Sequence, residues 1–282
     1  MTPPEKNPPE YQAKKRFGQN FLVDENIIRN IINGIAPKNS DHLVEIGPGL
    51  GALTKHLVGQ CKKLDVVEID RVLAERLEQQ FGDSTGFQLH CSDALKTDFS
   101  HFTETEQALR IIGNLPYNIS TPILFHLLNF KHYIHDMHFM LQKEVVDRMA
   151  SPPGQKSYGR LSVMVQYHCH VEPLFTVPPS AFKPAPKVES AIVRLRPRNR
   201  STPVTDPDLF AKIVNLCFQQ RRKTLRNGLK ILLKDFPDNC IDHFDLSRRP
   251  GTFSVEEFIA LSNQLGDANS AKSNGNPLDP QE

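Results

Sequence analysis

The chain has 282 residues, of which 23% are charged and 39% hydrophobic, and its formal net charge is only +2. No run reaches the ~18 apolar residues of a membrane span, and the first residues lack the apolar core of a secretory signal. The five cysteines are odd in number and form no Cys-x-x-Cys pair. They predict a reducing, cytoplasmic location rather than a disulfide framework.

Short strand-like runs alternate with helical patterns after a proline-rich start at residues 1–13, which we predict to be a flexible arm. Apolar runs typical of strands occur at residues 43–46, 64–69, 87–91, 110–112, 137–141, 167–177 and 191–195. Helical periodicity occurs at residues 25–35, 51–58, 72–81, 121–128, 143–150 and 160–165. This order predicts an α/β fold with a mostly parallel sheet of seven strands and one antiparallel edge strand, because the last two strands follow each other closely.

The alternation ends at residues 201–207, which are typical of a linker in composition. Beyond it only helical patterns occur, at residues 209–219, 225–233 and 255–265, so we predict a small all-α domain over residues 208–265. The α/β domain then covers residues 14–200. Residues 266–282 are rich in Asn, Ser and Pro, and we expect a disordered tail there because little apolar surface offsets the entropy of ordering.

The near-neutral net charge conceals a segregated distribution. Residues 41–106 contain 12 acidic and 6 basic side chains, whereas residues 209–234 contain seven basic side chains and no acidic one. Residues 183–200 contain six basic side chains and one acid. Any one of these clusters is compatible with a solvated helix face, but together they favour a nucleic-acid partner, because a polyphosphate requires gathered positive charge.

A glycine-rich turn containing Gly47 and Gly49 follows the first predicted strand and opens a helix. Glycines in such a turn let the backbone approach a ligand closely. Glu68 ends the second strand, where an acid can bind both hydroxyls of a ribose, and Asp93 follows the third, where it can accept a hydrogen bond from an adenine amino group. These signals predict nucleoside binding and leave NAD and S-adenosylmethionine as alternatives.

The segment Asn114-Leu115-Pro116-Tyr117 follows the fourth predicted strand and favours methyl transfer to an exocyclic amine. The lone pair of an adenine N6 is delocalised into the ring, so acceptors directed at its N–H bonds would make it more nucleophilic. The Asn114 side-chain oxygen and the Leu115 carbonyl are two such acceptors. Pro116 stiffens the turn, and Tyr117 offers a face on which an extruded base can stack.

These motifs together resemble those of the adenine-N6 dimethyltransferases that modify ribosomal RNA, and most closely the bacterial small-subunit branch of that family. The matching segments are residues 16–22, 45–51, 68–70, 93–94, 114–121, 142–149, 158–162 and 182–188. The resemblance implies a Rossmann-like class I S-adenosylmethionine methyltransferase. It also implies dimethylation of two adjacent adenosines near the 3′ end of 16S rRNA during small-subunit biogenesis.

The resemblance also implies roles for single residues. Asn20 and Leu22 would close over S-adenosylmethionine, and Phe182 would stack on the flipped base opposite Tyr117, although a core phenylalanine is an equal alternative for Phe182. The cofactor would also contact Gly47, Gly49, Glu68, Asp93 and Asn114. One departure from the family is Ser92, where relatives carry Gly, but its small side chain predicts that the site survives.

The start of the second helix in the small domain carries unopposed cations that suit RNA phosphates. These are Arg221, Arg222, Lys223 and Arg226, and Thr224 is a candidate helix cap. Such cations oppose the helix dipole, which favours a partner. The spacing of the histidines predicts no metal site, and no feature requires a dimer, so we expect a monomer.

Three other functions remain as alternatives at this point. A 23S rRNA adenine-N6 methyltransferase of the macrolide-resistance type shares the catalytic motifs. A ribosome-assembly factor that acts mainly by binding shares the cationic surface. A dehydrogenase shares only the glycine-rich turn.

Overall fold

The computed structural model describes residues 19–234, 236, 241 and 243–274, and the chain divides into two compact units. The first unit comprises Met1–Lys143 and Leu174–Arg194, and the second comprises Glu144–Pro173 and Leu195–Glu282. The division passes through the last two strands of the sheet, and the sequence-based domain limits stay a prediction. The predicted flexible arm, residues 1–13, lies outside the described residues.

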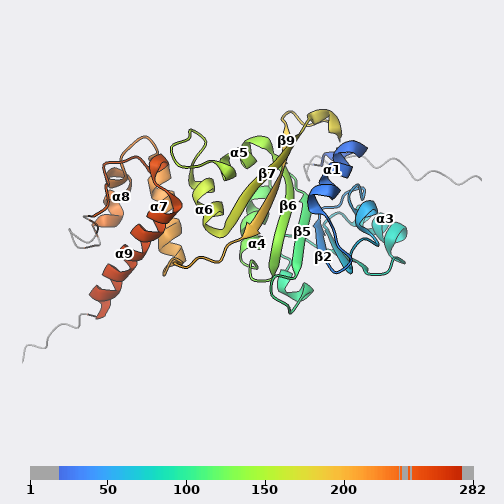
Figure 1. The fold of residues 1–282 in the computed structure, drawn as a ribbon, viewed down its shortest axis with the longest axis horizontal. Helices are drawn as coiled ribbons and strands as arrows, with labels where there is room; N and C mark the ends of the chain where they lie inside the picture. The colour runs from blue at the N-terminus through green and yellow to red at the C-terminus, as the bar shows by residue number, and fades with distance from the viewer. Residues whose placement is uncertain (1–18, 235, 237–240, 242, 275–282) are drawn as a thin grey trace, which may run out of the picture. The chain divides into compact units, whose positions relative to one another are not determined.

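Helices and strands alternate through the first unit at nearly the predicted positions (Figure 1). In chain order these are β1 (Phe21–Leu22), α1 (Glu25–Ile35), β2 (His42–Ile46), α2 (Thr54–Leu57), β3 (Lys63–Glu68), α3 (Arg71–Phe81), β4 (Phe87–Cys91), η2 (Phe99–Phe102), β5 (Leu109–Asn114), α4 (Ser120–Leu128) and β6 (Ile134–Gln142). Later come β7 (Cys169–Val177), η3 (Pro179–Ala181), β8 (Phe182–Lys183) and β9 (Ser190–Pro197).

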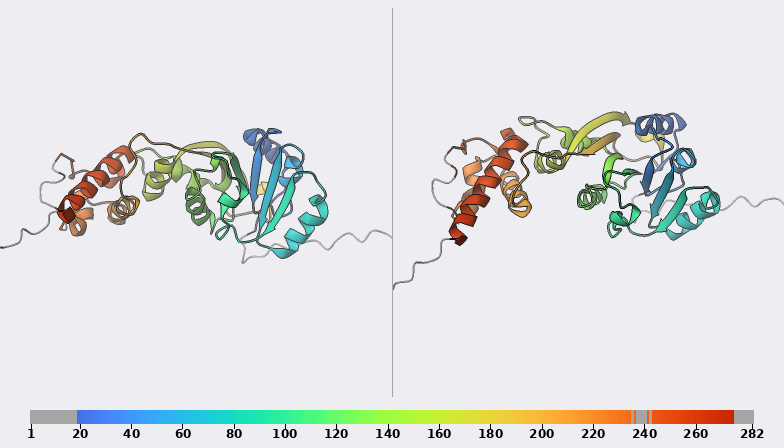
Figure 2. Two further views of the ribbon diagram at one scale, coloured as in Figure 1. Left: turned by 90° about the horizontal axis from the view of Figure 1, so that it is seen from below. Right: turned by 60° about the horizontal axis from the view of Figure 1, so that its bottom comes forward.

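Seven strands form one sheet in the order β4-β3-β2-β5-β6-β9-β7, which confirms the predicted fold class. The pairs β2–β3, β2–β5, β3–β4 and β5–β6 are parallel. The antiparallel edge is formed by β7 and β9, with β9 inserted next to β6. Figure 2 shows the blue-to-cyan strands of this sheet side by side, and α3 packs along β3 and β4. Because successive strands leave β2 in opposite directions, the sheet has a topological switch point between β2 and β5.

Helix α1 illustrates how local sequence signals and burial act together. Asp24 caps its first turn by accepting hydrogen bonds from two backbone N–H groups, at 2.9 and 3.1 Å. Ile28, Ile31 and Ile35 recur at helical spacing and are each at most 4% exposed. They pack in a core cluster with apolar side chains of α2, α3 and the strands, and this cluster fixes the helix against the sheet.

A buried carboxylate joins the first three strands of the sheet. Asp65 of β3 is fully buried, and its oxygens contact His42 Nε2 at 2.5 Å, His90 Nε2 at 2.7 Å and Lys63 Nζ at 2.9 Å. Although burial raises the pKa of Asp65, the hydrogen bonds from His42, His90 and Lys63 hold it well below its ordinary value. The Asp65 carboxylate is therefore ionised and links β2, β3 and β4.

The second unit is mainly helical and has its own core. Its helices are α5 (Lys143–Ala150), α6 (Arg160–His168), α7 (Pro207–Gln219), α8 (Leu225–Leu233), η4 (Pro250–Thr252) and α9 (Val255–Asn274). Phe210 of α7 and Phe258 of α9 are buried in this core, as is Tyr158, which precedes α6. Thr224 caps α8 through its Oγ1, which accepts the Asn227 N–H at 3.4 Å and confirms the predicted cap.

The prediction of a disordered tail over residues 266–282 is wrong for its first part, because α9 continues to Asn274. Ala268 packs against the core of the second unit, and no proline interrupts the helix before Pro277. Residues 275–282 lie outside the described residues. Across the described part of the chain, no helix is both long and apolar enough to cross a membrane.

Candidate active site

The glycine-rich turn lies at the switch point, directly after β2. Gly47, Gly49 and Gly51 have φ angles of 65°, 60° and 79°, in the left-handed region that disfavours other residues. The Gly51 N–H donates to the Pro48 carbonyl at 2.9 Å and closes the turn. A Cβ at Gly47 would meet no atom within 4 Å, whereas a Cβ at Gly49 would lie 3.1 Å from the Phe21 ring. At Gly47 the backbone of this turn is therefore open to a ligand.

Glu68, the last residue of β3, faces this turn and is only 4% exposed. Its Oε2 accepts a hydrogen bond from the Gly49 N–H at 3.2 Å, and its Oε1 accepts one from the Asp70 N–H at 2.9 Å. Burial raises the pKa of Glu68, and these two N–H groups oppose the rise. Each oxygen retains a lone pair for another donor, so the carboxylate suits paired hydroxyl groups.

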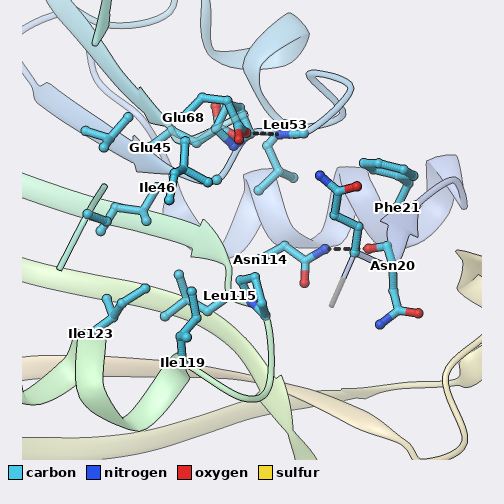
Figure 3. A pocket seen from close by; sticks show the side chains of 18 of the residues that line it. Asn20, Phe21, Glu45, Ile46, Leu53, Glu68, Asn114, Leu115, Ile119 and Ile123 are labelled. Carbon is cyan, nitrogen blue, oxygen red and sulfur yellow. Dashed lines mark hydrogen bonds between the residues drawn. The ribbon is translucent and has the colours of Figure 1, made fainter. Parts of the chain in front are cut away.

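A second buried carboxyl, missed as a site residue by the sequence analysis, lies beside Glu68 (Figure 3). Glu45 is 2% exposed, and its Oε2 accepts a hydrogen bond from Thr54 Oγ1 at 2.7 Å. Burial raises the pKa of Glu45 to about 7, against the Thr54 hydrogen bond and with a contribution from the charge of Glu68. An acid inside an otherwise apolar strand was the available signal, since such a residue needs a polar partner.

The end of β5 brings Asn114 to the same cavity. A Cβ at Gly113 would lie 2.6 Å from the Ile46 carbonyl oxygen, so glycine allows β5 to approach the end of β2. The Asn114 Nδ2 donates a hydrogen bond to the Asn20 carbonyl at 3.1 Å (Figure 3). This bond holds the carboxamide in one orientation, and its side-chain oxygen can accept a hydrogen bond from a ligand.

The turn after Asn114 is held at several points. The Leu115 N–H donates to the Met140 carbonyl at 3.3 Å, and the Pro116 carbonyl accepts from the Ile119 N–H at 3.1 Å. The half-buried Tyr117 has its hydroxyl 2.7 Å from Ser190 Oγ. Burial raises the pKa of Tyr117, and the Ser190 hydrogen bond lowers it. The tyrosine ring is thereby fixed at the cavity, with its hydroxyl bound to β9.

Asp93 lies at the other end of the cavity, directly after β4. Its Oδ1 accepts the Leu95 N–H at 3.0 Å, and its carbonyl accepts from Lys96 and Thr97. The preceding Ser92 donates its N–H to the Glu68 carbonyl at 3.0 Å. The small side chain of Ser92 thus fits a turn that is fixed mainly by backbone bonds.

One cavity is lined by residues from the ends of β1 to β5 and the start of α4. It gathers nearly all the predicted catalytic and cofactor-binding residues: Asn20, Leu22, Gly47, Gly49, Glu68, Asp93, Asn114, Leu115, Pro116 and Tyr117. Within the described residues, no group of three His, Cys, Asp or Glu side chains is arranged to hold a metal ion. The roles of the gathered residues stay predictions, but their convergence defines one candidate site.

Phe182 stands apart from these residues. It lies in β8 and pairs with Leu22 of β1 in a separate antiparallel sheet. Its side chain is 5% exposed and packs in the core cluster of the first unit, outside the lining of the cavity. The structure therefore places Phe182 next to β1, which borders the cavity, and not in the cavity lining. Its stacking role stays a prediction.

The predicted RNA-contacting cations lie in the second unit. Arg221, Arg222 and Lys223 follow α7, and Arg226 is in the first turn of α8. All four residues are exposed. None of them forms an ion pair with a described acidic residue, so their charge is available to an anionic partner.

Comparison with known proteins identifies relatives over nearly the whole chain. Residues 10–265 match the family model of the ribosomal RNA adenine dimethylases. Two proteins named ribosomal RNA small subunit methyltransferase A are similar to this chain. That of Saccharophagus degradans is 55% identical over 90% of this chain and 95% of its own length. That of Pseudomonas aeruginosa is 51% identical over 92% of this chain and 96% of its own length.

Two solved structures of related methyltransferases are also similar to this chain, at lower sequence identity. A dimethyladenosine transferase from Plasmodium falciparum is 28% identical, with a TM-score of 0.75, over 89% of this chain and 98% of that chain. The 23S rRNA methyltransferase ErmE is 25% identical, with a TM-score of 0.66, over 88% of this chain and 100% of that chain. The proteins named for the small subunit are thus about twice as similar in sequence as ErmE.

Proposed function

The chain belongs to the ribosomal RNA adenine dimethylase family, and on this premise we propose that it dimethylates N6 of two adjacent adenosines near the 3′ end of 16S rRNA. The methyl donor is S-adenosylmethionine, and the substrate is the small ribosomal subunit or its assembly intermediate. The high identity to proteins named for the small subunit supports this substrate over 23S rRNA. The family match supports a methyl donor over NAD.

The cavity fits S-adenosylmethionine by the chemistry of its walls. Glu68 would hold the ribose hydroxyls, because its two fixed oxygens each have a free lone pair. Gly47 and Gly49 would admit the methionine and ribose portion to the backbone, and Asp93 would accept from the adenine amino group. Asn20 and Leu22 would cover the cofactor from the side of β1. When bound, the cofactor supplies an electrophilic methyl group.

The catalytic proposal depends on Asn114, whose carboxamide is oriented by the hydrogen bond from its amino group to the Asn20 carbonyl. Its side-chain oxygen would accept one N–H of the target adenine, and the Leu115 carbonyl would accept the other. These acceptors would draw the N6 nitrogen toward pyramidal geometry and free its lone pair for in-line attack on the methyl group, whose bond to sulfur would break as the N–C bond forms and N6 loses a proton. Pro116 has no N–H to compete for them. Holding the reacting atoms ~3–3.5 Å apart would account for much of the rate.

The target adenine would stack on Tyr117, whose orientation is fixed by Ser190. For Phe182 to stack on the other face, its ring must leave the core cluster, so we propose that β1 and β8 rearrange when RNA binds. In the second unit, Arg222, Lys223 and Arg226 would contact phosphates and position the RNA without reading bases. Arg221, the fourth predicted cation, donates a hydrogen bond to the Lys156 carbonyl. We propose that the enzyme acts as a monomer in the cytoplasm.

The test is incubation of the protein with labelled S-adenosylmethionine and unmethylated small subunits, followed by mapping of the label on the rRNA. The Asn114→Ala variant should fold normally and lose methyl transfer by about 100-fold, the effect of removing one well-placed polar group. Gln88→Ala is the matched control, because Gln88 is an exposed carboxamide on β4 outside the cavity. Near-normal turnover by Asn114→Ala would refute the role of its amide, and label confined to 23S rRNA would refute the substrate.

A further inference from the structure

An exposed loop between α5 and α6 is held against the second unit at both of its ends. Residues 152–157, with the sequence Pro-Pro-Gly-Gln-Lys-Ser, are all exposed. The Gly154 N–H donates to the Gly251 carbonyl at 2.7 Å, and the hydroxyls of Ser151 and Ser157 lie 2.9 Å apart. Tyr158, fully buried, donates its hydroxyl hydrogen to the Phe253 carbonyl at 2.8 Å. The loop therefore has a defined position although its side chains contact solvent.

Arg221 makes the contact that brings this loop to the end of α7. Its Nη2 donates a hydrogen bond to the Lys156 carbonyl. In parallel, Arg160 at the start of α6 donates from Nη1 to Asn215 Oδ1 of α7 at 3.0 Å. These two bonds place the Lys156 backbone beside the segment that carries the predicted RNA-contacting cations. Lys156 itself is exposed and forms no ion pair with a described residue.

A third segment adds positive charge at the start of α8. The N–H groups of Leu225 and Arg226 donate to the carbonyls of Arg248 and Leu246, at 2.8 and 3.0 Å. These bonds place residues 246–249 beside the first turn of α8, where Arg249 is exposed. The charge of Arg248 is already balanced by Glu257. Exposed cations therefore lie on three separate segments: the 152–157 loop, residues 221–226 and residues 246–249. The backbone N–H groups of Leu225 and Arg226 at the start of α8 already have partners.

We propose that the 152–157 loop is a second arm of the RNA-binding surface, in which Lys156 contacts a phosphate and Arg221 is a positioning residue that holds the loop. The inference rests on the proposed function, since it takes ribosomal RNA as the partner. The chemistry it requires is a phosphate backbone, because cations on separate segments neutralise a repeated charge and read no base. Lys156 and the cations at residues 222–226 would then contact different phosphates of the same RNA.

The test is the affinity of Lys156→Gln and Arg221→Gln for unmethylated small subunits, measured over a series of salt concentrations. Lys156→Gln should weaken binding about threefold to tenfold and reduce the slope of log affinity against log salt by about one, as loss of one phosphate contact does. Lys38→Gln, which removes an exposed cation of the first unit outside the basic segments, should change neither quantity. Unchanged affinity and slope in Lys156→Gln would overturn the proposal.

A double variant separates positioning from direct contact. If Arg221 acts through the loop, Arg221→Gln should cost much less in the Lys156→Gln background than in the wild type. Hydrogen exchange of residues 152–157 should also accelerate in free Arg221→Gln, and Arg221→Lys should restore protection because lysine can donate to the same carbonyl. Additive costs together with unchanged exchange would refute the role given to Arg221. Failure of the wild type to bind small subunits would instead refute the proposed function.

Discussion

Replacing Glu45 by Gln tests how burial controls charge inside the candidate cavity. The Glu45 carboxyl is 2% exposed, and its pKa is raised from 4.5 to about 7, first by burial and then by the charge of Glu68. Glutamine keeps an oxygen that can accept the hydrogen bond from Thr54 and has nearly the same volume. The substitution therefore removes the titration and leaves the packing and the hydrogen bond in place.

The magnitude follows from the difference between the folded and unfolded pKa values. Below pH 4.5 the carboxyl is protonated in both states and costs no stability. As the pH rises from 4.5 to about 7, the unfolded state ionises first, so the wild type loses free energy of unfolding at about 1.4 kcal/mol per pH unit. Above pH 7 the loss is constant at about 3 kcal/mol. The carboxamide of the Glu45→Gln variant does not titrate, so this variant should gain that amount relative to the wild type.

The assay must report on the first unit alone, because two units need not unfold in one step. Hydrogen exchange of peptides from β2 and β3, measured over a series of urea concentrations, meets this requirement. The wild type and Glu45→Gln are compared at each pH from 4 to 9. The stability difference should rise between pH 4.5 and 7 and then level off. A difference that does not change with pH would refute the reasoning, because the pKa of Glu45 would then be the same in the folded and unfolded states.

Three further predictions concern other groups of the first unit. Asp65→Asn should lower the free energy of unfolding of the first unit at pH 7 by about 3 kcal/mol, as measured by the same urea-dependent hydrogen exchange of β2 and β3 peptides. This loss should diminish as the pH falls below 3.8, because the stabilisation that comes from the lowered pKa of Asp65 is complete above that value and declines steadily below it; a constant loss down to pH 2 would contradict it. Gly49→Ala should weaken S-adenosylmethionine binding about tenfold or more in calorimetry, because Gly49 has a φ of 60° and the new Cβ would press on the Phe21 ring. An unchanged Kd would show that the turn adapts. Tyr117→Phe should reduce methyl transfer less than about tenfold, since it loses only the bond to Ser190, whereas Tyr117→Ala should lose more; equal losses would argue against stacking.

Much of the fold could be predicted from the sequence because its signals are local. The spacing of Ile28, Ile31 and Ile35 predicts an amphipathic helix, and the structure forms one with that face buried. The alternation of apolar runs with helical patterns predicts a parallel sheet, because parallel neighbours need a crossover helix between them. Gly47, Glu68 and Asp93 could be assigned to one edge because each follows a strand, and parallel strands end at the same side of the sheet.

Only the tertiary structure decided which of these residues meet and in what chemical state. The sequence does not show that Asn114 donates to the Asn20 carbonyl, because that bond joins segments 94 positions apart. It does not place Phe182 in the core, since that burial depends on surfaces supplied by other elements, and α9 continues to Asn274 where composition predicts a disordered tail. The raised pKa of Glu45 likewise requires burial by other elements and the neighbouring charge of Glu68. Local sequence determines the periods and turns of this protein, whereas solvation, hydrogen-bond partners and charge depend on long-range packing.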